Sequence, residues 1–144
     1  CVFPLLVQCQ QRKEARSLFG NQEVVTIKLT FSDNTVTAEV EKVQYGTPTK
    51  NIIKDREFLI QAIGKRDKPA YELSINDPRR VVIDDDPANT SVVYRDKAVT
   101  YIHIPYSQAL TLLRIRGQSN RLAGLSTDIP IKEDLDRQYR LFRQ

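Results

Sequence analysis

The first patterned segment of the chain alternates strictly between apolar and polar residues. Between positions 23 and 31 every second residue is apolar, namely Val25, Ile27, Leu29 and Phe31. A period of two predicts a half-buried β-strand. The polar triplet at 32–34 predicts a turn, and renewed alternation over residues 35–40 predicts an antiparallel hairpin. The alternation changes phase before Val43, which predicts a β-bulge at Glu41 and Lys42.

Short apolar runs separated by turn residues continue through most of the chain. We expect further strands at residues 57–63, 71–75, 80–83, 91–94, 99–106 and 109–116. The nearly continuous apolar run at 57–63 indicates a central strand with little solvent on either face. Strands spaced by roughly 8–12 residues, with turn signals between them, are typical of sandwiches and barrels. The predicted fold is therefore an all-β antiparallel sandwich of about 7–8 strands.

The last segment has a helical period instead. Its apolar positions are Ile131, Leu135, Tyr139 and Phe142, spaced by four, four and three residues. This spacing predicts a short amphipathic helix, with Asp128 and Pro130 as its cap and first turn. The expected organisation is an N-terminal tether or truncated export signal over residues 1–19, a sandwich over 20–127 and a helix over 128–144.

Composition narrows the class of protein. The 144 residues carry 40% apolar and 28% charged residues, with a mean hydropathy of −0.43, as in a soluble globular domain. The formal net charge is +4, from 22 Lys and Arg against 18 Asp and Glu. Because acidic residues are interspersed with the basic ones, no basic stripe forms, and we expect no nucleic-acid partner.

Both cysteines, Cys1 and Cys9, lie in the first nine residues, around an apolar run too short to span a bilayer. The segment before Cys9 resembles the end of a bacterial lipoprotein signal, which implies lipidation of Cys9, although Gln8 departs from the small residue usual at that place. On this interpretation the chain, which lacks Met, enters partway through an export signal. The alternative is an ordinary apolar first strand with two free thiols.

Few residues offer candidate chemistry. His103 is the single histidine, which excludes multi-histidine metal sites, and no Gly-x-Ser-x-Gly motif supplies a nucleophile for it. The run Asp84–Asp86 lacks the spacing of a calcium loop, so we expect a solvated turn. Paired carboxylates and a tyrosine platform for sugars are possible by count alone. We therefore expect no catalytic, metal or cofactor-binding residues and no cofactor.

The segments 58–63, 71–80 and 99–115 together resemble the immunoglobulin-like or fibronectin-like sandwich modules of bacterial secreted and surface proteins. The resemblance spans residues 23–126 and implies a non-catalytic accessory role. We expect an exported cell-envelope lipoprotein that binds a protein or glycan through loops 46–56 and 84–90, or through an exposed sheet face. The alternatives are a small secreted hydrolase or carbohydrate-binding protein with a carboxylate pair, and strand-edge pairing with a partner.

Overall fold

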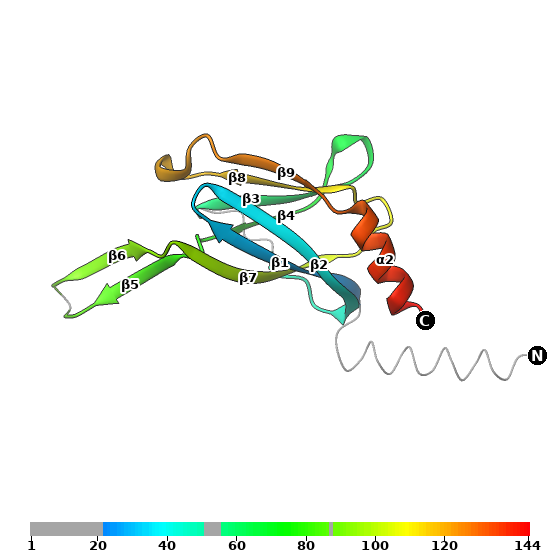
Figure 1. Cartoon of the computed structure of the whole chain (residues 1–144), viewed down its shortest axis with the longest axis horizontal. Coiled ribbons are helices and arrows are strands. Elements are labelled where there is room, and N and C mark those ends of the chain that lie inside the picture. The colour runs from blue at the N-terminus through cyan, green and yellow to red at the C-terminus, as the bar shows by residue number, and fades with distance from the viewer. Residues whose placement is uncertain (1–21, 51–55, 87) are drawn as a thin grey trace, which may run out of the picture.

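Nine strands and one α-helix make up the described part of the chain, residues 22–50, 56–86 and 88–144, in a computed structural model (Figure 1). The strands are β1 (Gln22–Ser32), β2 (Thr35–Gly46), β3 (Phe58–Ile63), β4 (Pro69–Ile75), β5 (Arg80–Asp84), β6 (Thr90–Tyr94), β7 (Lys97–Pro105), β8 (Leu112–Gly117) and β9 (Ser126–Pro130). The helix is α2 (Lys132–Phe142), and two 3-10 turns are η1 (Lys65–Asp67) and η2 (Asn120–Leu122).

Two antiparallel sheets pack face to face. One has the strand order β2-β1-β7 and the other β4-β3-β8-β9. Their facing side chains form one buried apolar cluster, in which the rings of Phe31 and Phe58 lie 4.9 Å apart across the two sheets. The arrangement confirms the predicted all-β antiparallel sandwich with a short C-terminal helix.

The first hairpin follows the sequence pattern closely. Every inward residue of the first alternation is fully buried, and Asp33 adopts a positive φ of 51° in the turn. Thr26 lies opposite Lys42 and Ile27 opposite Val40, which leaves Glu41 unpaired in a bulge. The bulge prediction is confirmed, since the extra residue is what returns Val43 to the core side.

The strand β3 is central, between β4 and β8, but one of its faces is partly accessible to solvent. Leu59 and Gln61 are half-buried on the outer side of the sheet. They lie opposite Arg116 and Arg114 of β8, whose aliphatic stems can cover a neighbouring side chain while the charge stays in water. An apolar outer residue therefore does not require a second layer above it.

A ninth strand replaces the predicted start of the helix. Asp128 lies opposite Arg114 in the β8–β9 pair and accepts a 2.9 Å hydrogen bond from its Nε. The prediction that Asp128 and Pro130 begin the helix is thus wrong, because both belong to β9; α2 begins at Lys132, after the N-cap residue Ile131. The strand expected at 109–116 likewise begins later, at Leu112.

The apolar stripe of the helix is confirmed. Leu135 is fully buried, the Tyr139 ring stacks on Tyr106 at 4.1 Å, and Phe142 meets Tyr45 edge-on. The helix thereby closes one end of the sandwich (Figure 1). Within the described residues no helix has the length and apolar character needed to cross a membrane.

Candidate functional site

The β5–β6 hairpin projects from the opposite end of the sandwich as an arm (Figure 1). Within the described residues β5 and β6 pair with each other and with no third strand. The arm nevertheless carries large apolar side chains that are exposed, namely Val82, Ile83, Val92, Val93 and Tyr94. Apolar residues gathered in this way on a surface are typical of an interaction site.

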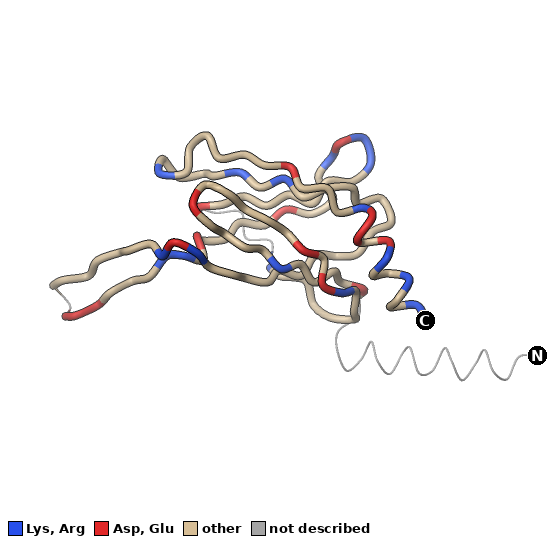
Figure 2. Tube along the Cα trace, in the orientation of Figure 1, with Lys and Arg blue, Asp and Glu red and all other residues tan. Residues whose placement is uncertain are grey.

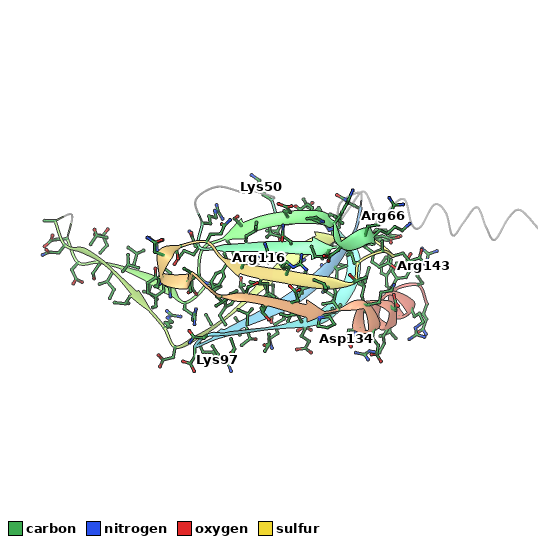
Figure 3. The ribbon with its side chains drawn as sticks, turned by 90° about the horizontal axis from the view of Figure 1, so that it is seen from above. Lys50, Arg66, Lys97, Arg116, Asp134 and Arg143 are labelled. Atoms are coloured by element: carbon green, nitrogen blue, oxygen red, sulfur yellow. The ribbon has the colours of Figure 1, made fainter. Side chains whose placement is uncertain are left out.

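Both faces of the arm are apolar. Residues directly opposite in an antiparallel pair share a face, so Val82 with Val92 forms one face and Val81 with Val93 the other. Figure 3 shows the side chains standing on both sides of the ribbon, beyond Lys97 at the start of β7. An isolated two-stranded ribbon is at best marginally stable in water, so this arm depends on how its base is held.

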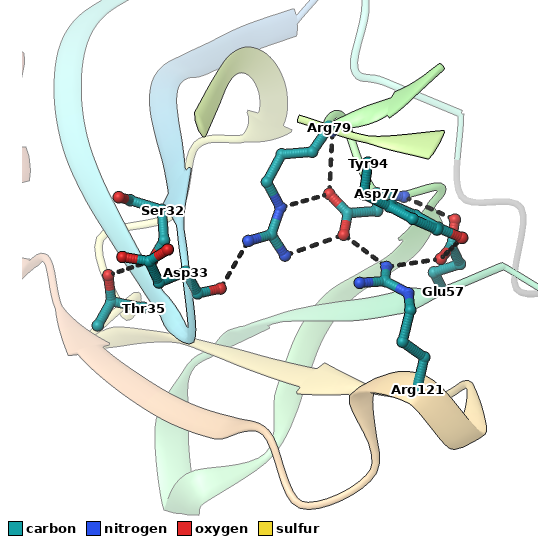
Figure 4. A network of polar contacts seen from close by, with 8 residues as sticks. All are labelled: Ser32, Asp33, Thr35, Glu57, Asp77, Arg79, Tyr94 and Arg121. Atoms are coloured by element: carbon teal, nitrogen blue, oxygen red, sulfur yellow. Dashed lines mark hydrogen bonds and ion pairs between the residues drawn. The ribbon is translucent and has the colours of Figure 1, made fainter. Parts of the chain in front are cut away.

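A buried ion pair lies at the base of the arm. Asp77 and Arg79 follow β4, and their side chains are 0% and 7% exposed. The carboxylate accepts hydrogen bonds from Nε and Nη2 of Arg79 at 3.0 and 2.9 Å and from its backbone N–H at 3.0 Å. The remaining end of the guanidinium donates to the Asp33 carbonyl at 2.5 Å. The arm is therefore joined to the β1–β2 turn (Figure 4).

A second arginine joins the same carboxylate to the other sheet. Nη2 of Arg121, in η2, donates to Asp77 at 2.6 Å and to Glu57 at 2.9 Å. Glu57 also accepts the Tyr94 hydroxyl at 3.0 Å, and the Arg121 guanidinium lies 3.6 Å from the centre of the Tyr94 ring. We call Glu57, Asp77, Arg79, Tyr94 and Arg121 the arm-base cluster (Figure 4).

The charges of the arm-base cluster balance, with two carboxylates against two guanidiniums. Burial by itself would raise the pKa of Asp77, but hydrogen bonds from Arg79 and Arg121 outweigh it and hold the pKa below its usual value. Burial would likewise lower the pKa of Arg121, and its bonds to Glu57 and Asp77 raise it instead. Asp77 and Arg121 are thus both ionised at neutral pH, and their hydrogen bonds join the base of the arm to the sandwich.

Both carboxylates of the arm-base cluster bind arginine. Glu57 and Asp77 are close, since they share one nitrogen of Arg121. The chemistry these carboxylates support is the binding of arginine.

His103 lies on the outer face of the β2-β1-β7 sheet. Its Nδ1 is 3.0 Å from the hydroxyl of Thr26, which also accepts a 3.3 Å hydrogen bond from Gln44. These side chains line an open pocket of about 370 Å³, together with Tyr101 and the bulge residue Glu41. The polar side chains join the three strands of the sheet across its surface.

The acidic triplet lies at the tip of the arm. Asp86 accepts hydrogen bonds from the backbone N–H of Ala88 at 2.7 Å and from the Asn89 side chain at 3.3 Å, while Asp84 accepts the Thr90 hydroxyl at 3.3 Å. The carboxylates of Asp84 and Asp86 therefore stabilise the turn. Among the described residues no three His, Cys, Asp or Glu side chains gather as a metal site.

The tyrosines do not form a common platform. Tyr106 stacks on α2, and Tyr71 donates its hydroxyl to the Thr49 carbonyl, while Tyr94 belongs to the arm-base cluster. Residues 84–86 and 88–90 of one expected contact loop lie at the arm tip. In the other expected contact loop, the Thr49 N–H donates to the His103 carbonyl of β7. Residues 51–55 and the predicted lipidation site Cys9 lie outside the described residues.

The arm-base cluster was not predicted. In the sequence, Asp77 and Arg79 stand beside Pro78 in what looks like an ordinary turn, and Arg121 is 44 residues from Asp77. The signal that existed was local, since Asp in such a turn binds the backbone two residues on. Burial of both charges required the tertiary structure.

Comparison of the chain with known protein families, curated proteins and solved structures finds no match.

Proposed function

We propose that this chain is a non-catalytic interaction domain that binds a polypeptide partner through the β5–β6 arm. The observation that carries the proposal is a ribbon with apolar residues on both faces, held by a buried ion-pair cluster, whose outer strand edges pair with no other strand in the described part of the chain. Held in this way, the arm loses little freedom on binding, and preorganisation of that kind strengthens association. Unpaired edges also offer main-chain hydrogen bonds to an added strand.

The finer proposal concerns location. A lipid anchor at Cys9 would tether the domain to the bacterial cell envelope, where an accessory module of the immunoglobulin-like or fibronectin-like type meets envelope or extracellular proteins, or a glycan. In the full-length protein, Cys9→Ser is expected to move the protein from the membrane to the soluble fraction. Unchanged partition would contradict the anchor and leave the proposal for the arm intact.

Site-specific photo-crosslinking tests the role of the arm. A crosslinking amino acid at position 82, where Val82 is 49% exposed, is compared with one at position 141, where Leu141 is 55% exposed on α2. We expect position 82 to yield a discrete polypeptide adduct in an envelope extract, reduced by excess unlabelled domain, and position 141 to yield none. Equal labelling from both positions, or none from position 82, would overturn the proposal.

A further inference from the structure

Within the described residues, the outer edge of β5 pairs with no other strand. Opposite residues of an antiparallel pair alternate between those that exchange hydrogen bonds and those that direct their N–H and C=O outward. The Arg95 N–H donates to the Arg79 carbonyl at 2.8 Å, and Arg80 lies opposite Tyr94 in the next pair. By alternation, Arg80, Val82 and Asp84 direct their main-chain groups away from β6. The N–H of Arg80 is bonded to the Asp77 carbonyl, and its C=O faces outward.

The sequence of β5 is self-complementary when two copies run antiparallel. The strand reads Arg-Val-Val-Ile-Asp. With Val82 opposite Val82 of a second copy, Arg80 falls opposite Asp84 and Val81 opposite Ile83. Opposite charges and β-branched pairs across strands both stabilise a sheet. The other strand, Thr-Ser-Val-Val-Tyr, has no charged residue and gives no such match.

The charges of the whole arm are distributed like those of β5, with arginines toward the base and aspartates at the tip. Arg80 and Arg95 lie at its base, where Asp96 follows Arg95, and Asp84, Asp85 and Asp86 lie at its tip. Figure 2 shows blue and red segments together at the base and red at the tip. Two arms side by side in opposite directions bring each acidic tip to the other's basic base. Two parallel arms would bring like charges together.

We propose, building on the proposed function, that the arm binds the arm of a second copy of this chain. The two β5 strands pair antiparallel about a two-fold axis at Val82, and the two ribbons become one four-stranded sheet. Val82 exchanges both main-chain hydrogen bonds with its counterpart, and the Asp84 N–H of each copy meets the Arg80 carbonyl of the other. The two-fold axis makes the contact closed, as is usual in homodimers.

The contact is small, because it joins two five-residue strands. The surface area that it buries therefore falls short of the roughly 1,200 Å² of a standard interface. We therefore expect a dimer that dissociates on dilution. Its charge pairs lie at the surface, where salt screens them. We expect the dimer to weaken as the ionic strength rises.

Charge reversal tests the register by sedimentation equilibrium. Arg80→Asp alone places Asp opposite Asp84, and Asp84→Arg alone places Arg opposite Arg80, so each should weaken self-association about tenfold or more. A one-to-one mixture of the two variants restores opposite charges at both places. We expect that mixture to form dimers as well as the wild type does. The control is Glu39→Arg, an exposed reversal on β2, which should leave self-association unchanged.

Circular dichroism establishes that each variant is folded before its self-association is measured by sedimentation equilibrium. A wild-type domain that stays monomeric at about millimolar concentration, the weak end of measurable affinity, would overturn this inference, and so would single variants that dimerise like the wild type. A crosslinked adduct at position 82 that contains a different polypeptide would then still support the proposed function. If neither an adduct nor a dimer forms, both proposals fail.

Discussion

Asp77→Asn tests the arm-base cluster with the smallest change of shape. Asparagine keeps one oxygen for Nε and the backbone N–H of Arg79, but it turns an –NH2 toward the two nitrogens that donate to Oδ2. Those are Nη2 of Arg79 at 2.9 Å and Nη2 of Arg121 at 2.6 Å. The variant therefore loses two charge-assisted hydrogen bonds and leaves the buried Arg79 without its counter-ion.

The expected loss of folding free energy is about 3–5 kcal/mol. A hydrogen bond to a charged group contributes about 1.5–3 kcal/mol, and breaking one side of a buried ion pair costs a similar total of about 3–5 kcal/mol. That is a large part of the roughly 5–15 kcal/mol that stabilises a typical domain. At about 2–4 °C per kcal/mol for a chain of this size, Tm should fall by roughly 10 °C.

The effect should depend on pH in a defined direction. The folded-state pKa of Asp77 is lowered, so its contribution is complete above the unfolded value of about 3.9 and is lost as pH falls through the folded value. Denaturant titrations at pH 7 and near pH 3 should therefore show a large difference between wild type and Asp77→Asn at pH 7 and a smaller one at low pH.

The matched control is Asp128→Asn. Asp128 also binds an arginine, Arg114, but its side chain is 47% exposed, and exposed pairs contribute little. We expect a much smaller loss of stability than for Asp77→Asn. The reasoning is refuted if Asp77→Asn costs less than about 1 kcal/mol at pH 7, the level of a surface pair, or if its cost is the same at both pH values.

Three further outcomes are expected. Gly117→Ala should destabilise the fold by about 2 kcal/mol in denaturant titrations, because a Cβ there would lie 2.2 Å from the Leu122 carbonyl oxygen. The control is Gly124→Ala, whose Cβ would meet nothing within 4 Å. Because the φ of Gly124 is +90°, this control should cost only about 1 kcal/mol from backbone strain. Leu135→Ala removes the buried anchor of α2 and should cost about 3 kcal/mol by the same titration; a loss near zero would mean that the helix contributes little to the core. The Tm should be the same in calcium and in chelator, since Asp84 and Asp86 bond to their own turn; a rise with calcium would show binding to the folded state.

Local pattern predicted the core of this fold well. The alternation at Val25–Phe31 and its change of phase at Val43 specify both the buried face and the bulge, because each depends on neighbours in the chain. Residues 126–130 were not identified as a strand for the same reason. In that segment only Thr127 and Ile129 alternate with more exposed residues, which is too short a pattern to identify a strand. Asp128 and Pro130 are residues typical of the start of a helix. The segment is a strand because it pairs with β8, which lies outside the pattern that the sequence shows locally.

The site was harder to predict than the core. Val81, Val82 and Ile83 have the composition of a buried strand, and nothing in the segment itself shows that no layer covers it. The same holds for Asp77 and Arg79, whose burial depends on the β1–β2 turn and η2, which are distant in sequence. The local pattern of apolar and polar residues predicts that a segment forms a strand. Whether the side chains of that strand are exposed depends on which other parts of the chain pack against it.

The close approach of Arg79 and Arg95 has an evolutionary consequence. The chain leaves the sandwich and returns to it through residues joined by one 2.8 Å hydrogen bond, so the fifteen-residue span 80–94 is an insert whose two ends already meet. A hairpin of another length or sequence that keeps Tyr94 of the arm-base cluster can be exchanged at that point without shifting β4 or β7. Relatives with the same sandwich are therefore expected to differ most in this segment, and a transplanted arm should carry its binding specificity with it.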